Sequence, residues 1–212
     1  VGSGNHARSY LFQTELGELF QLPLCWYGQD GRWGMAPGFE FEDHLGFTRA
    51  VPRDCIACHD AYPDLAPGAD AYGEPAVFPQ ELPHGIGCQR CHGPGAEHVR
   101  LADDLDSPLG AGRASIVNPA RLDADRRDDV CLQCHLQPSA RHTSIVHAFD
   151  RGAHSFPPGE ALAAHAVRVE FGDGPDGRPD PGRFEINHHA YRLRQSRCFV
   201  ESARRPGDGT GD

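Results

Sequence analysis

Hydrophobic and polar residues alternate loosely near the start of the chain, over residues 9–27. Two hydrophobic runs, at residues 10–12 and 19–22, are separated by a turn signal centred on Gly17. Alternation of this kind around a glycine turn is typical of two antiparallel strands. The pattern therefore predicts one short β-hairpin in the N-terminal part of the chain.

Three later stretches have the signals of short helices. Residues 96–105 follow Gly93-Pro94-Gly95, which stops any helix begun earlier. Asn118-Pro119 is typical of a helix start and precedes residues 120–135, where Asp and Arg would form the outer face. Residues 185–200 have the clearest helical period. Their apolar positions are Ile186, Ala190, Leu193 and Val200, with His189 beside them.

The remaining segments are predicted to be irregular. Residues 35–54 have no clear period, residues 60–87 are rich in proline, and residues 172–183 consist largely of turn residues. The chain holds 25 Gly and 18 Pro, a share that favours long loops. We expect a mainly α domain with extensive irregular loops over residues 1–200. The Gly- and Asp-rich residues 201–212 are expected to form a disordered tail.

Three Cys-x-x-Cys-His motifs lie in this irregular sequence. In each motif, two thiols three positions apart suit thioether bonds to the two vinyl groups of one porphyrin, and the following His suits the iron. The motif residues are Cys55, Cys58 and His59, then Cys88, Cys91 and His92, then Cys131, Cys134 and His135. The sequence therefore predicts three covalently attached haem c groups.

Other uses of paired cysteines are weaker alternatives. A Cys-x-x-Cys pair can be half of a zinc site, a redox dithiol or a disulfide. None of these requires His at the next position, and three pairs cannot be matched two by two as zinc knuckles. Two further cysteines, Cys25 and Cys198, lie outside the motifs. A disulfide between them stays open, and two unrelated buried thiols are the preferred interpretation.

Composition supports an interior filled by cofactor. The chain has 212 residues, of which 39% are hydrophobic, which is a small share for an ordinary protein core. Three large, flat and mostly apolar haems would supply the missing apolar volume. We therefore expect the polypeptide to pack around its haems.

The charge of the chain limits its possible partners, and haem attachment indicates its location. The formal net charge of −10 argues against nucleic acid, which is bound by basic surfaces. No stretch reaches the 18 or more apolar residues of a membrane span. Because haem c is attached on the outer side of the energy-conserving membrane, we expect a periplasmic or otherwise extracytoplasmic protein. The chain begins at Val1 without a signal peptide, so its precursor is expected to carry an export signal.

The ligand at the sixth iron position decides the haem chemistry. Met35 is the single Met for three haems, so Met ligation cannot be general. Three of the 13 His belong to the motifs, which leaves ten. Because Met/His ligation raises the haem potential, we expect low-spin, low-potential haems with two His ligands each. The candidate distal ligands, in order of preference, are His98, His6, one of His188 and His189, and then His147 and His154.

Four segments carry a family likeness: residues 86–99, which run from Ile86 through the second motif and His98 to Val99, and residues 118–122, 130–136 and 191–199. They resemble multihaem c-type cytochromes related to the tetrahaem cytochrome c of nitrifying bacteria. Together they are similar to bacterial multihaem proteins that often carry tetratricopeptide repeats after the haem domain. The resemblance runs over residues 1–199.

The chain departs from that family pattern at both ends. Such proteins usually have another haem motif before the segment that matches Gly2-Ser3-Gly4-Asn5-His6. They have one more shortly after the segment that matches Ser196-Arg197-Cys198-Phe199, and residues 202–212 stand in its place here. We therefore expect a truncated chain, and His6 is the candidate ligand most affected by that expectation.

The favoured function is electron transfer to and from redox partner proteins, with the oligomeric state left open. The acidic surface would steer docking to a basic partner. The alternative is an enzyme in which one haem with an open distal side reduces nitrite or oxidises hydroxylamine. No residue pattern selects such a site. A sensor module that regulates attached repeats and a zinc-binding interaction module are weaker possibilities.

Overall fold

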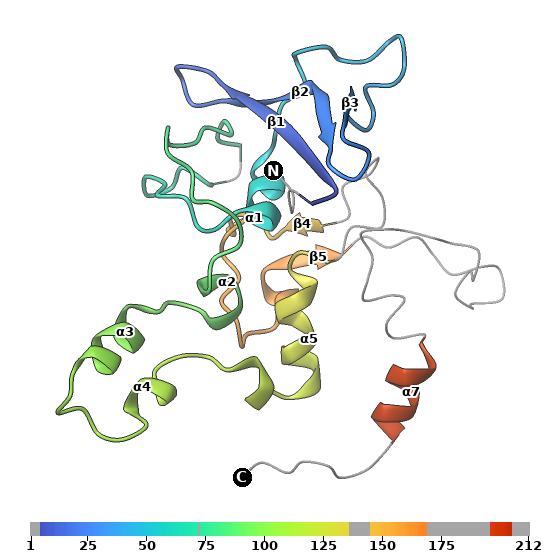
Figure 1. The fold of residues 1–212 in the computed structure, drawn as a ribbon. Helices are drawn as coiled ribbons and strands as arrows, with labels where there is room; N and C mark the ends of the chain where they lie inside the picture. The colour runs from blue at the N-terminus through green and yellow to red at the C-terminus, as the bar shows by residue number, and fades with distance from the viewer. Residues whose placement is uncertain (1–4, 72, 136–144, 169–195, 205–212) are drawn as a thin grey trace.

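The computed structural model describes residues 5–71, 73–135, 145–168 and 196–204 of the chain. In this part, short helices and two small antiparallel sheets are joined by long irregular segments. In Figure 1 the N-terminal sheet lies at the top, and the helices α3 (Ala96–Asp103) and α4 (Ala111–Ala114) lie at the lower left. The segments that carry the three Cys-x-x-Cys-His motifs lie between them. No helix in the described ranges is long and apolar enough to cross a bilayer.

The predicted β-hairpin is confirmed and has a third strand. Strand β1 (Ala7–Gln13) pairs with β2 (Leu19–Tyr27), and β2 pairs with β3 (Arg32–Met35). Gly17 lies in the connecting turn with a φ of 92°, where an added Cβ would come within 2.6 Å of the Phe78 carbonyl oxygen. Trp26 and Trp33 face each other across β2 and β3 with ring centroids 5.5 Å apart. Cross-strand aromatic pairs of this kind stabilise a sheet and explain the third strand.

A hydrophobic cluster joins the N-terminal sheet to helix α1 (Arg53–His59), which contains the first motif. Ile56, the residue after the first motif cysteine, is 3% exposed. It packs with Leu19 of β2 and with Val51 and Phe78 of the surrounding loops. The cluster fixes the first motif directly beneath the sheet.

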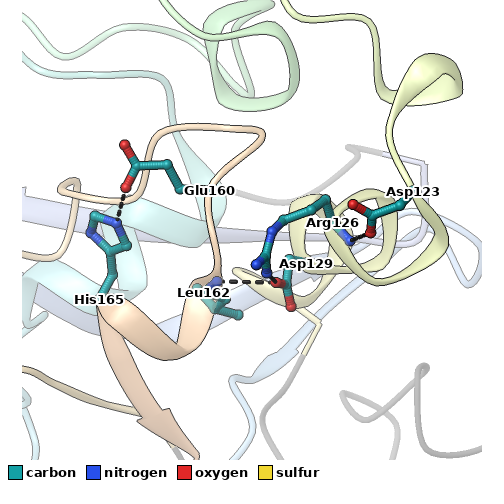
Figure 2. Close-up of polar contacts among 6 residues, drawn as sticks. All are labelled: Asp123, Arg126, Asp129, Glu160, Leu162 and His165. Carbon is teal, nitrogen blue, oxygen red and sulfur yellow. Dashed lines mark hydrogen bonds and ion pairs between the residues drawn. The ribbon is translucent and has the colours of Figure 1, made fainter.

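Helix α5 (Ala124–Leu132) leads into the third motif and is held at both ends. At its start, an Asp123 carboxylate oxygen accepts a hydrogen bond of 2.9 Å from the Arg126 backbone N–H, which caps the helix (Figure 2). On its side, Asp129 accepts from the backbone N–H of Leu162 at 3.1 Å and pairs with Arg126 at 3.3 Å. At its end, Leu132 is 2% exposed. It belongs to the cluster of Leu132, Phe156, Leu162 and Ala166.

The second motif forms the short helix α2 (Gln89–His92) and is followed by α3, which confirms the helix predicted at residues 96–105. The 3₁₀-helix η1 (Pro119–Arg121) begins where Asn118 caps the Ala120 N–H, and α5 lies within the range predicted as helical. Over the residues that the structure describes, the fold has short helices and two small sheets rather than the expected mainly α arrangement.

Later elements add a second sheet that was not predicted. The 3₁₀-helix η2 (Leu162–Ala164) precedes strand β5 (Ala166–Arg168), which pairs with β4 (Ile145–His147). Strands of three residues are too short to show an alternating pattern in the sequence.

The C-terminal part is described only around helix α7 (Arg197–Arg204). Most of the helix predicted at residues 185–200 and the loop at residues 172–183 lie outside the described residues. Helix α7 continues past Val200, so residues 201–204 are helical although the Gly- and Asp-rich composition had placed them in a disordered tail. Residues 205–212 lie outside the described residues.

All eight cysteines are free thiols, including the two outside the motifs. Cys25 is buried in β2, where it packs with Ala36 and Phe39. Cys198 is exposed on α7, so the preference for a buried thiol was correct for Cys25 and wrong for Cys198. The disulfide left open by the sequence is not formed.

Candidate haem-binding site

Each motif occupies a helical turn, which places its two thiols on one face. The first motif lies in α1 and the second in α2. The third begins in α5 and ends in the following turn, where the His135 N–H donates to the Cys131 carbonyl at 3.1 Å. In the second motif the His92 N–H donates to the Cys88 carbonyl at 3.0 Å. Thiols on one side of a helical turn suit two bonds to a single porphyrin.

The three motifs meet at one cavity of about 340 Å³. The first and third motifs contribute all their Cys and His residues, and the second contributes Arg90 and Cys91. The motif residues that line it are Cys55, Cys58, His59, Cys91, Cys131, Cys134 and His135. Its volume lies in the range of cofactor and ligand sites. Segments up to 80 positions apart in sequence therefore share one binding space.

The motif thiols differ in their exposure. Four of them are exposed, namely Cys55, Cys88, Cys91 and Cys131. Cys58 and Cys134 are partly buried inside the cavity. Every motif therefore has at least one thiol open to an incoming porphyrin, and the donor set fits covalent haem attachment.

The motif thiols also differ in pKa. A thiol hydrogen bond between Cys58 and Cys134 is the largest influence on both residues. It raises the pKa of Cys58, which burial raises further, and it lowers the pKa of Cys134 to about 7, with the Arg90 guanidinium acting in the same direction. Burial is the main reason that the pKa values of Cys55 and Cys131 are raised. Since the thiolate is the nucleophile, Cys134 is the most activated of these four thiols.

His92 is oriented as an iron ligand would be. Its Nδ1 lies 2.8 Å from the carbonyl oxygen of Val117, and the Val117 N–H donates back to the His92 carbonyl at 3.2 Å. Because a carbonyl oxygen only accepts, Nδ1 carries the proton and Nε2 is left with its lone pair. Metal-ligating histidines are typically fixed in this way by a backbone carbonyl.

His98 has the same arrangement on α3. Its Nδ1 lies 2.6 Å from the carbonyl oxygen of Gly112, next to α4, so its Nε2 also keeps a lone pair. The side chain is partly buried. The sequence had made His98 the first candidate distal ligand because of its position after the second motif, and this geometry suits that role.

The other predicted distal ligands have different surroundings. His6 is exposed just before β1, where its carbonyl oxygen accepts from the Gly28 N–H at 2.7 Å. His147 on β4 directs Nε2 to the Asp54 carboxylate of α1 at 3.0 Å, and Asp54 lines the cavity. His188 and His189 lie outside the described residues.

His154 stands out among the histidines that the sequence ranked last. Both of its ring nitrogens are buried and have no hydrogen-bond partner among the described residues. Its ring lies 5.6 Å from that of Tyr62. It lines a second cavity of about 270 Å³ together with Gln89 of the second motif and Pro94. Burial and then the Arg90 charge lower the pKa of His154 to about 4, which keeps the imidazole neutral near pH 7.

A second buried histidine has a structural role instead. His165 donates from Nε2 to the Glu160 carboxylate at 2.8 Å (Figure 2). Its ring packs edge-on against Phe156 at 5.7 Å. The sequence held no local pattern that separated His154 from His165, because their difference depends on contacts from distant segments.

Two polar side chains inside the motifs connect the motifs to one another. Arg90 donates from Nη2 to the Ala57 carbonyl of the first motif at 2.7 Å. Gln133 of the third motif donates from Nε2 to the Arg90 carbonyl at 2.7 Å and to the Val130 carbonyl at 2.8 Å. Sequence reasoning missed both residues, because the positions between the motif cysteines carry no signal for the haem.

Comparison with known proteins supports the class that these motifs define. Over 143 residues, the chain is 28% identical to the C-type polyheme cytochrome OmcB of Geobacter sulfurreducens, in each of two strains. The match covers 65% of this chain and 16% of OmcB, so the chain spans about a sixth of the length of the curated relatives it matches. No family model matches the chain. A crystal structure of the outer cell wall cytochrome OcwA superposes with a TM-score of 0.45 and 17% identity, covering 80% of this chain and 32% of OcwA.

The sequence relationship to OmcB, together with the three Cys-x-x-Cys-His motifs, supports membership of the multihaem c-type cytochrome family. The resemblance inferred from the sequence is confirmed at that level. The narrower likeness to the tetrahaem cytochrome of nitrifiers and to proteins with tetratricopeptide repeats stays a prediction.

Proposed function

We propose that this chain is an electron-transfer segment that carries three covalently attached haem c groups. The observation that carries the proposal is the meeting of three Cys-x-x-Cys-His motifs at one cavity. Related polyheme cytochromes support the class. When bound, haem c supplies an iron that changes between the ferrous and ferric states.

The chain's own residues would bind and orient these groups. The six motif cysteines would form the thioethers, and His59, His92 and His135 would be the proximal ligands. The carbonyl of Val117 fixes the ring orientation and tautomer of His92. Because Arg90 and Gln133 connect the backbones of the three motifs, they hold the attachment points at fixed separations.

The distal ligands are proposed to be histidines, which would give low-spin, low-potential centres. His98 has the orientation of a ligand, and the ring nitrogens of His154 are buried beside the second motif without a hydrogen-bond partner in the described part of the chain. His6, His147, His188 and His189 remain further candidates. With every iron closed by two histidines, the protein would exchange electrons without binding a substrate.

The proposed partners are redox proteins with basic docking surfaces, because the formal charge of the chain is −10. The proposed location is periplasmic or otherwise extracytoplasmic, since haem c is attached there. The domain is proposed to extend over residues 1–200.

The first test is to count covalent haems by intact mass on the purified protein. We expect three haems in the unchanged chain and two in the double variant Cys88→Ser/Cys91→Ser. Cys25→Ser, which changes a buried thiol outside the motifs, should keep all three. A chain that carries zinc and no haem would overturn the proposal.

The second test asks whether His154 closes an iron. His154→Ala should turn one low-spin haem into a high-spin haem that binds carbon monoxide, as measured by optical and electron paramagnetic resonance spectra. His84→Ala, which changes an exposed histidine, should leave the spectra unchanged. A fully low-spin spectrum in His154→Ala, with no new ligand in place, would exclude His154 from the ligand set.

A further inference from the structure

Arg90 is a buried charged side chain whose hydrogen-bond donors are only partly satisfied by the residues that the structure describes. Its side chain lines the cavity shared by the motifs and is 3% exposed. One nitrogen, Nη2, is satisfied by the Ala57 carbonyl. The other two, Nε and Nη1, are buried and have no hydrogen-bond partner in the part of the chain that the structure describes.

The neighbours of Arg90 compensate its charge only in part. The guanidinium carbon lies 4.9 Å from the centroid of the Tyr62 ring, a cation–π contact. No ion pair among the described residues involves Arg90. A buried guanidinium with free donors is costly unless an anion accepts from them.

We infer that Arg90 is the anion-binding residue of the cavity and that its free N–H groups hold a haem propionate carboxylate. This inference rests on the proposed function, because the carboxylate belongs to the haem. Arginine is suited to the task because its N–H groups form strong charge-assisted hydrogen bonds with carboxylates. A free inorganic oxyanion such as nitrite has the same acceptor chemistry and is the competing occupant.

The proposal predicts a change in both the potential and its pH dependence. The positive charge of Arg90 favours the reduced haem, which carries one positive charge fewer, and it holds the pKa of the propionate low. In Arg90→Gln, one midpoint potential should fall, and the pH range over which that potential varies should move upward. Arg90→Lys keeps the charge but lacks the guanidinium geometry. Its midpoint potential and pH range should therefore lie between those of the unchanged protein and Arg90→Gln.

The experiment is a spectroelectrochemical titration of the haem-loaded protein at several pH values, with and without nitrite. Arg113→Gln, an exposed arginine on α4, is the matched control and should behave as the unchanged protein does. Intact mass is measured first, because absence of haem from the unchanged chain refutes the proposed function rather than the role of Arg90. The inference would be overturned if Arg90→Gln, Arg113→Gln and the unchanged protein all carry three haems and have the same midpoint potentials at every pH.

Two further outcomes are also decisive. In one outcome, nitrite shifts a midpoint potential of the unchanged protein, Arg90→Gln loses this shift, and the pH profile of the potential is the same in both proteins. This result would show that Arg90 binds a free oxyanion and would overturn the propionate assignment. If Arg90→Gln does not retain its haems, resonance Raman spectra of the unchanged protein and of Arg90→Lys test whether Arg90 contacts a propionate. The propionate bending band should shift between them, and an identical band would refute the contact.

Discussion

The first and third motifs are anchored in a different way from the second. In the first and third, the residue after the first cysteine is apolar and buried in a hydrophobic cluster, namely Ile56 and Leu132. In the second motif the equivalent residue is the exposed Gln89, and the next residue is the buried Arg90. Hydrophobic packing fixes the first and third motifs, and hydrogen bonds between motifs fix the second.

This difference has a consequence for specificity. Hydrophobic burial is strong but non-directional, whereas a hydrogen bond fixes the position of its donor and acceptor. The two packed motifs are joined to separate clusters, one beneath the N-terminal sheet and one beside α5. The polar motif lies between them and sets their relation through Ala57 and Gln133.

Removing an apolar anchor should have the largest effect on stability. Leu132→Ala is expected to lower the free energy of unfolding by about 2–5 kcal/mol, because it leaves a cavity in a packed cluster. Urea denaturation followed by far-ultraviolet circular dichroism measures the change. Leu109→Ala, at a fully exposed position, should have little effect. Equal losses in the two variants would contradict the packing role of Leu132.

Breaking the hydrogen bonds between motifs should have a smaller effect on stability. Gln133→Ala removes the donor to the Arg90 and Val130 carbonyls and is expected to cost about 1–3 kcal/mol in the same denaturation experiment. Gln89→Ala changes an exposed glutamine at a motif position and serves as the control. If Gln133→Ala is as stable as its control, the second motif is not held by this contact.

The smallest effect is expected at the start of α5, which leads to the third motif. Asp123→Ala removes the cap of the Arg126 N–H and should cost about 1 kcal/mol. Asp123→Asn keeps an acceptor oxygen and should retain most of the stability. Thermal unfolding of the two variants compares them. A loss that is the same for both substitutions would point to the charge of Asp123 rather than to its hydrogen bond.

The attachment motifs and the hairpin could be predicted because their signals are local. Two cysteines and a histidine within five residues indicate a haem site without knowledge of the fold, and residues 9–27 show their strand pattern directly. The helix at residues 96–105 follows a glycine–proline stop. Each of these predictions depends on neighbours in sequence.

The arrangement around the cavity could not be predicted, because it depends on contacts between distant segments. Arg90 meets Ala57 across 33 positions and Gln133 across 43. His154 was a lower-ranked candidate, and only the contacts of the folded chain show that its ring nitrogens are buried and have no hydrogen-bond partner among the described residues. Sequence position alone, on which His6 was chosen as a candidate ligand, does not show whether a histidine is buried or paired.

The hydrogen bonds that join the motifs also bear on how much the loops between them can vary. Residues 60–87 and 93–130 connect attachment points that are fastened to one another by Arg90 and Gln133. Insertions at exposed positions of such loops cost little conformational entropy and leave the fastened points in place. If the motifs hold haems as proposed, the length of chain between two motifs can change without altering the distance between the groups attached to them.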